Sequence, residues 1–111
     1  MKLLIAGSRD IDDFELDEYI PGDVDLIITG GASGVDSLAE KYADKKKISK
    51  LILRPDYKRY GKAAPIMRNK RMIEIADMVI VVWNGHSRGT KATLDYARKA
   101  EKKLLLINVD N

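Results

Sequence analysis

Three short segments of this 111-residue sequence combine glycine with hydroxyl or guanidinium side chains, which are groups that bind phosphate oxygens. They are residues 7–9, 30–36 and 84–90, which read Gly-Ser-Arg, Gly-Gly-Ala-Ser-Gly-Val-Asp and Asn-Gly-His-Ser-Arg-Gly-Thr. Because glycine has no Cβ, its backbone N–H group can approach an anion closely, and a following helix N-terminus adds partial positive charge. A tight turn explains any one segment equally well, whereas the three together favour a phosphate-bearing ligand.

The segments follow apolar runs that are typical of buried strands. These runs lie at residues 2–6, 26–29 and 78–83, and two more lie at residues 50–53 and 104–109. Uninterrupted apolar strands that alternate with helical patterns indicate a parallel sheet covered on both faces. We therefore predict one doubly wound, three-layer α/β domain over the whole chain, with a five-stranded parallel sheet in the order 3-2-1-4-5. In that order the loops after strands 1, 2 and 4 converge at the carboxyl edge of the sheet.

Helical patterns fill the intervals between these strands. A short helix is expected from a cap at residue 12 or 13 to about residue 20, and a second follows from the apolar spacing of residues 35–43. A third begins at Pro65 and reaches about residue 76, and a fourth follows residue 90. Residues 58–64 lack a period and are predicted to form a loop. The residues expected to face inward in the first, third and fourth helices are Leu16, Tyr19, Ile20, Ile66, Met72, Ile73, Ala76, Thr93, Leu94, Ala97 and Ala100.

Charge is unevenly distributed along the chain. Residues 1–25 hold eight acidic residues against two basic ones, and residues 26–111 hold eighteen basic residues against nine acidic ones. Residues 54–71 carry seven basic side chains and one acid. Most basic runs are solvated faces, but this one flanks the expected site loops. Single-stranded DNA binding is therefore one alternative function, although only Tyr57 and Tyr60 are available there for stacking on bases.

Several kinds of chemistry are absent from the sequence. It has no cysteine, which excludes disulfides and thiolate sites. His86 is the only histidine and no carboxylates have metal-ligand spacing, so we expect neither a metal nor a cofactor. Neither the Gly-Lys-Ser/Thr loop of nucleotide triphosphatases nor the Gly-x-Gly-x-x-Gly dinucleotide fingerprint is present. No apolar run approaches the roughly 20 residues of a membrane span and no signal peptide is seen, so a cytoplasmic location is expected.

Four motifs are spread over nearly the whole chain. They are Gly7-Ser8-Arg9, the segment 30–36, Tyr60-Gly61-Lys62-Ala63-Ala64-Pro65 with Met67-Arg68-Asn69, and Ser87-Arg88-Gly89-Thr90. Together they resemble the YspA-type, cpYpsA-related branch of the SLOG superfamily. The resemblance implies a Rossmann-like domain that binds nucleotides or nucleotide-derived ligands, often as a sensor, with no established reaction.

The SLOG superfamily also contains the Lonely Guy phosphoribohydrolases, which release the base from a nucleoside monophosphate. They carry Arg-Lys-x-x-Met and then Pro-Gly-Gly-x-Gly-Thr-x-x-Glu. In this sequence their arginine falls on Arg68, their lysine on Asn69 and their glutamate on Thr93. Threonine cannot replace that carboxylate, and Asp95 lies about 200° around the helix from Thr93. N-glycosidase activity remains the second alternative, and binding without catalysis is favoured.

The predicted site unites the three loops with Arg68, which comes from the third of these motifs. The backbone N–H groups of Gly30, Gly31 and Gly89 and the hydroxyls of Ser8, Ser87 and Thr90 are expected to hold phosphate oxygens, with charge from Arg9, Arg68 and Arg88. Asp36 either caps its helix or accepts a ribose hydroxyl, and we favour the cap. Homodimerisation is expected by analogy with related domains. The complete set of predicted ligand-binding residues is Gly7, Ser8, Arg9, Gly30, Gly31, Ala32, Asp36, Arg68, Asn69, Gly85, Ser87, Arg88, Gly89 and Thr90.

Overall fold

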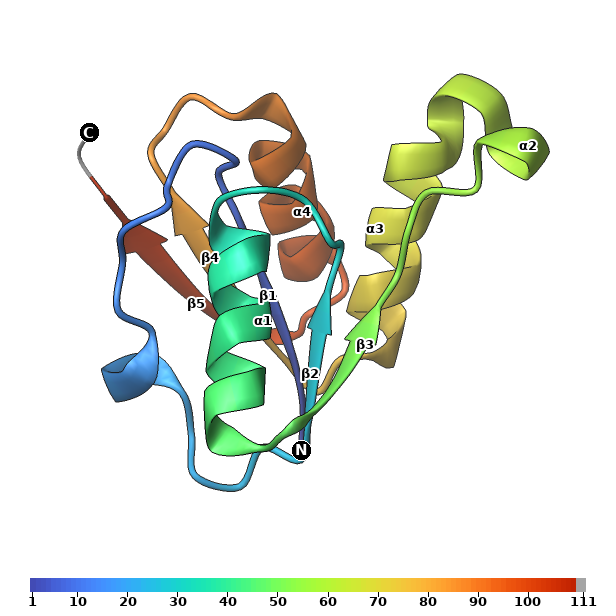
Figure 1. The fold of residues 1–111 in the computed structure, drawn as a ribbon. Coiled ribbons are helices and arrows are strands. Elements are labelled where there is room, and N and C mark those ends of the chain that lie inside the picture. The colour runs from blue at the N-terminus through green and yellow to red at the C-terminus, as the bar shows by residue number, and fades with distance from the viewer. Residues whose placement is uncertain (110–111) are drawn as a thin grey trace.

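Five parallel strands form the centre of the molecule, of which the computed structural model describes residues 1–109 (Figure 1). The strands are β1 (Lys2–Gly7), β2 (Leu26–Thr29), β3 (Ser49–Ile52), β4 (Met78–Trp83) and β5 (Lys103–Asn108). They lie in the order β3-β2-β1-β4-β5, and every neighbouring pair is parallel. The predicted sheet and its strand order are confirmed.

Helices cover both faces of this sheet. α1 (Val35–Lys46) lies on one face, and α3 (Ala64–Ile75) and α4 (Arg88–Lys99) lie on the other (Figure 1). Successive strand residues point to opposite faces, so Ile5 is buried in the core under α1 and Leu4 in the core under α3 and α4. The two cores explain why the central strands are apolar throughout. Among residues 1–109, no helix is long and apolar enough to span a membrane.

The segment between β1 and β2 differs from the prediction of a capped helix there. Its only helical element is the 3₁₀ turn Asp17–Tyr19, which has no side-chain cap. Ile11 and Leu16 are both buried in the core under α1, with 3% and 2% of their surface exposed. Residues 11–16 form no helix, and the chain between these two buried side chains instead follows an irregular path along this core.

Residues 58–64 were predicted to form a loop, but they form short helical turns instead. α2 (Tyr57–Tyr60) is followed by the 3₁₀ turn Gly61–Ala63, and α3 begins directly after that turn. Asp56 is the N-cap of α2, since its Oδ1 accepts a hydrogen bond from the Arg59 N–H at 3.2 Å. The sequence shows no helical period here because α2 buries none of its residues.

Two residues predicted to face inward are exposed. Ile66 has 43% of its surface exposed because α2 and the first turn of α3 extend beyond the end of β3 (Figure 1). Ala100 is exposed because α4 ends at Lys99. The buried residues of α3 and α4 predicted correctly are Met72, Ile73, Ala76, Thr93, Leu94 and Ala97.

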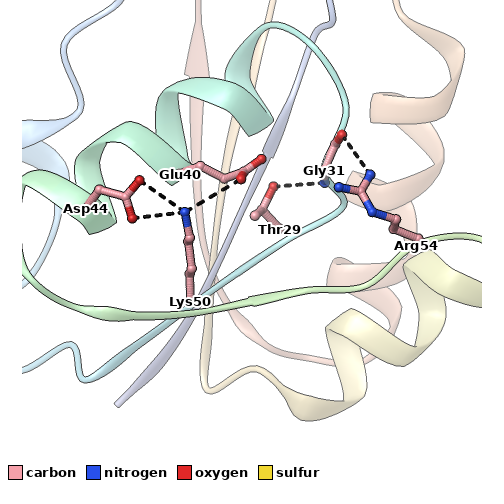
Figure 2. Close-up of polar contacts among 6 residues, drawn as sticks. All are labelled: Thr29, Gly31, Glu40, Asp44, Lys50 and Arg54. Carbon is pink, nitrogen blue, oxygen red and sulfur yellow. Dashed lines mark hydrogen bonds and ion pairs between the residues drawn. The ribbon is translucent and has the colours of Figure 1, made fainter.

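Ion pairs hold the edge strand β3 beside α1. Lys50 Nζ lies 2.9 Å from Asp44 Oδ1 and 3.9 Å from Glu40 Oε1 (Figure 2). Such partly exposed pairs contribute little stability individually. They lie between α1 and β3, and the chain leaves β3 through Leu53 and Arg54 at the carboxyl edge of the sheet.

The loops after β1, β2 and β4 meet around Ser8, as predicted. The Ser8 N–H donates to Val82 O at 3.0 Å, and Ser8 Oγ accepts a hydrogen bond from the Asn84 N–H at 3.1 Å. The Ser8 carbonyl oxygen accepts a hydrogen bond from the Val35 N–H at 3.2 Å. One residue therefore connects the end of β4, the loop after it and the first turn of α1.

Gly34→Ala should destabilise this junction. Gly34 has a φ of +71°, and an added Cβ would overlap the Ser8 carbonyl oxygen and the backbone of Arg9. Left-handed strain and overpacking together predict a loss of roughly 2–5 kcal/mol in the free energy of unfolding, measurable by urea denaturation. Gly22→Ala is the control because no atom lies within 4 Å of its added Cβ. Equal losses in the two variants would contradict the prediction.

Candidate functional site

A cavity of about 100 Å³ lies at the carboxyl edge of the sheet, between the three converging loops and α3. Of the predicted site residues, those that line it are Gly7, Arg9, Ala32, Asp36, Arg68, Asn69, Ser87, Gly89 and Thr90. Four lining residues were not predicted, namely Ala6, Pro65, Met72 and Thr93. Ligand pockets usually measure about 300–1,000 Å³. This cavity is therefore large enough for a phosphate or sugar group but too small for a whole nucleotide.

Arg68 of α3 is fixed in the cavity wall by three neutral partners. Its Nη1 donates to Gly30 O at 2.9 Å and to Leu53 O at 3.1 Å, and its Nε donates to Asn69 Oδ1 at 2.8 Å. Burial lowers the pKa of Arg68, and nearby Asp36 opposes that shift, but a guanidinium remains charged in proteins. Within residues 1–109 no carboxylate forms an ion pair with it, and its Nη2 makes no hydrogen bond. The cavity wall thus contains a partly buried positive charge with donor capacity left.

Among residues 1–109, Asp36 is the only carboxylate that lines the cavity, and 8% of its surface is exposed. It is not the helix cap we favoured, because Gly34 occupies the N-cap position of α1 and Asp36 lies within the first turn. Its Oδ2 accepts a hydrogen bond from the Ala32 N–H at 3.1 Å. Burial raises the pKa of Asp36, while the Ala32 N–H and the Arg68 charge act in the opposite direction.

Three backbone N–H groups of residues 31–35, after β2, are already bonded to protein oxygens. The Gly31 N–H donates to Thr29 Oγ1 at 3.4 Å (Figure 2), the Ala32 N–H to Asp36, and the Val35 N–H to Ser8 O. Figure 2 also shows Arg54 reaching back to this loop, where its Nη1 donates to Gly31 O at 3.5 Å. The second loop therefore holds the carboxylate of Asp36 where we expected an external phosphate.

The loop after β4 presents an open helix end to the cavity. Ser87 is the N-cap of α4, and its Oγ accepts hydrogen bonds from the Thr90 N–H at 3.3 Å and from Thr90 Oγ1 at 2.9 Å. Among the described residues, the Gly89 N–H has no hydrogen-bond partner, as is usual in the first helical turn. Of the three predicted backbone donors, Gly89 is thus the one that both lines the cavity and is available.

Five predicted site residues do not line this cavity. Ser8 is fully buried, with its Oγ bonded to the Asn84 N–H, so its hydroxyl serves the fold. Gly30 lies behind Arg68, to which its carbonyl oxygen is bonded, and Gly31 contacts Arg54. Gly85 and Arg88 are exposed outside the cavity lining. The pattern analysis named residues in all three loops that line this cavity, together with these five that do not.

Thr93 lies in the cavity wall, in the position where the hydrolase motif has glutamate. Its Oγ1 donates to the carbonyl oxygen of Gly89 at 3.1 Å. The hydroxyl therefore turns back toward the helix backbone, and no carboxylate occupies this position. Residues 1–109 also contain no group of three histidine, cysteine or acidic side chains able to hold a metal ion.

Asp36→Asn should change how stability depends on pH. Because burial raises the pKa of Asp36 above its unfolded value of 3.8, the folded state binds this proton more tightly than the unfolded state does. Asp36 therefore costs stability once the pH rises through its folded pKa. The free energy of unfolding of the variant minus that of the wild type should increase between about pH 4 and about pH 7, as measured by urea denaturation. A difference that stays constant over this range would show that Asp36 does not titrate as its burial requires.

Comparison with known proteins agrees with this architecture. A family model described as YspA, cpYpsA-related SLOG family matches residues 1–60, which include the loops after β1 and β2 and the whole of α1. No curated protein and no solved structure matches the chain. The match covers more than half of the sequence, and the remaining residues complete the same parallel sheet. The chain belongs to the YspA, cpYpsA-related SLOG family.

Proposed function

We propose that this protein binds a nucleotide or a nucleotide-derived molecule through its phosphate group at the Arg68 cavity. Membership of the SLOG family suggests nucleotide-related ligands in general. The observation that carries the proposal is the guanidinium of Arg68, which is partly buried and bonded only to neutral oxygens. Nearby Asp36 attracts this charge but forms no ion pair with it among residues 1–109, so part of the cost of desolvation remains. A bound anion would reduce that cost while accepting hydrogen bonds from Nη2.

Further donors around the cavity support a phosphate in this position. The Gly89 N–H at the start of α4 is available, and the helix N-terminus adds partial positive charge. Arg9 lines the same cavity from the loop after β1. A phosphate between Arg68 and Gly89 would therefore be held from both sides by donors that come from separate elements.

Asp36 supplies an acceptor for the sugar next to that phosphate. Its carboxylate lines the cavity and has only the Ala32 N–H as a hydrogen-bond donor among the described residues. A carboxylate has about four acceptor positions, so a ribose hydroxyl can donate to it without displacing Ala32. This arrangement favours a sugar phosphate over inorganic phosphate.

Arg68→Gln should weaken nucleotide binding. The variant loses the charge and Nη2, so affinity for nucleoside monophosphates should fall by roughly 10- to 100-fold, as expected for charge-assisted hydrogen bonds. Isothermal titration calorimetry measures the affinity, and urea denaturation confirms that the variant is folded. Arg98→Gln is the matched control, because Arg98 is exposed in the last turn of α4 and does not line the cavity. Equal affinity in the two variants would contradict the proposal.

We also predict that the protein does not release free base from nucleoside monophosphates at an enzyme-like rate. Thr93 lacks the charge and basicity that the hydrolases obtain from glutamate, and a missing acid or base typically removes about 10²- to 10⁴-fold in rate. Chromatography of overnight reactions with each nucleoside monophosphate is the measurement. Base release that disappears in Asp36→Asn would instead support a hydrolase in which Asp36 supplies the carboxylate.

A further inference from the structure

A second and larger cavity adjoins the first on the opposite side of Arg68. It measures about 410 Å³ and lies between the end of β3, α2 and α3, within the range of about 300–1,000 Å³ that is usual for ligand pockets. We propose that this cavity binds the base of the nucleotide whose phosphate lies on Arg68. The inference rests on the proposed function and extends it to the position of the base.

The position of Arg68 on α3 connects the two cavities. Pro65, Asn69 and Met72 line the smaller cavity, whereas Ala64 and Met67 line the larger one. Residues three and four positions apart share one side of a helix. Arg68 lies between these two sides of α3. It therefore lies in the wall of both cavities, and the proposal requires a ligand held by its guanidinium to extend from one cavity into the other.

The larger cavity has the surface chemistry that a planar base requires. Tyr60 and Met67 line it, and each has 37% of its surface exposed. An aromatic ring and a thioether are favourable contacts for the face of a base. The carboxylates of Asp56 and Glu74 also line the cavity and offer acceptors for amino or imino groups at the edge of a base.

Arg54 provides a second available charge in the wall of the larger cavity. It lines the larger cavity, and its contact with the protein is the 3.5 Å hydrogen bond to the Gly31 carbonyl oxygen (Figure 2). Among residues 1–109 it forms no ion pair. By contrast, Arg71 in the same lining is paired with Glu74 at 3.3 Å. The unpaired guanidiniums of Arg54 and Arg68 therefore border the larger cavity, which suits a base that is attached to a phosphate.

The test compares Tyr60→Ala with Tyr57→Ala, using nucleoside monophosphates and ribose 5-phosphate as ligands in calorimetry. Tyr57 belongs to the same helix and is 62% exposed, but it does not line the larger cavity. Tyr60→Ala should weaken binding of at least one nucleoside monophosphate by roughly tenfold, because stacking on a base is lost. Binding of ribose 5-phosphate should stay within about twofold of the wild type, and Tyr57→Ala should leave both ligands unaffected. Met67→Ala, at the other side of the cavity, should reproduce the selective loss.

Each other outcome overturns the inference in a recognisable way. Unchanged nucleotide binding in Tyr60→Ala and Met67→Ala would place the base elsewhere while keeping the phosphate site. If Tyr60→Ala weakened binding of ribose 5-phosphate as much as binding of the nucleotide, Tyr60 would stabilise the phosphate site and would not contact the base. If the wild type binds neither ligand, the proposed function itself fails. A further outcome is that the wild type binds only an oligodeoxythymidylate, that this binding weakens steeply with salt, and that both tyrosine variants lose affinity for it. The basic surface of α2 and α3 would then bind single-stranded nucleic acid instead of a nucleotide.

Discussion

The contacts of Ser8, through its backbone and its hydroxyl, are those on which the geometry of the carboxyl edge depends. A parallel sheet brings strand ends to one edge, but it does not specify how the loops that follow are packed. Here the Ser8 carbonyl oxygen accepts the Val35 N–H, its Oγ accepts the Asn84 N–H, and Gly34 permits the close approach because it has no Cβ. A side chain at Gly34 would separate these loops, and the cavity between them would lose its shape.

The charged side chains at this edge are held in place by hydrogen bonds to neutral groups more than by ion pairs. Carbonyl oxygens and an amide hold Arg68, and a backbone N–H holds Asp36. The two charges attract each other, but among residues 1–109 neither forms an ion pair. Such an arrangement keeps both side chains in fixed positions while leaving their charges available. The ion pairs that do form, such as Lys50 with Asp44 and Arg71 with Glu74, lie outside the smaller cavity.

The sequence allowed the sheet, its order and the loops at its edge to be predicted, because these depend on local patterns. The apolar run of β4 and the spacing of α1 are examples of signals contained within a dozen residues. What the sequence could not reveal depends on contacts between distant residues. The partners of Arg68 are its neighbour Asn69 and two carbonyl oxygens 15 and 38 positions away, and Ser8 is bonded to Asn84 across 76 positions. The burial of Ile11 likewise follows from the position of α1, which no local pattern encodes.

The carboxylate of Asp36 already accepts a hydrogen bond from the loop after β2, so this loop is not a free anion-binding site. An external anion can use the Ala32 N–H only after Asp36 has left it, so the loop acts as a site with an intramolecular competitor. Burial raises the pKa of Asp36 in this position, so a carboxyl that leaves the loop for solvent returns to a lower pKa. Occupation of this loop by an anion, with Asp36 displaced into solvent, would therefore be accompanied by net proton release, whereas occupation of the Arg68 and Gly89 side of the cavity would not displace Asp36. Proton stoichiometry thus distinguishes the two halves of a single cavity.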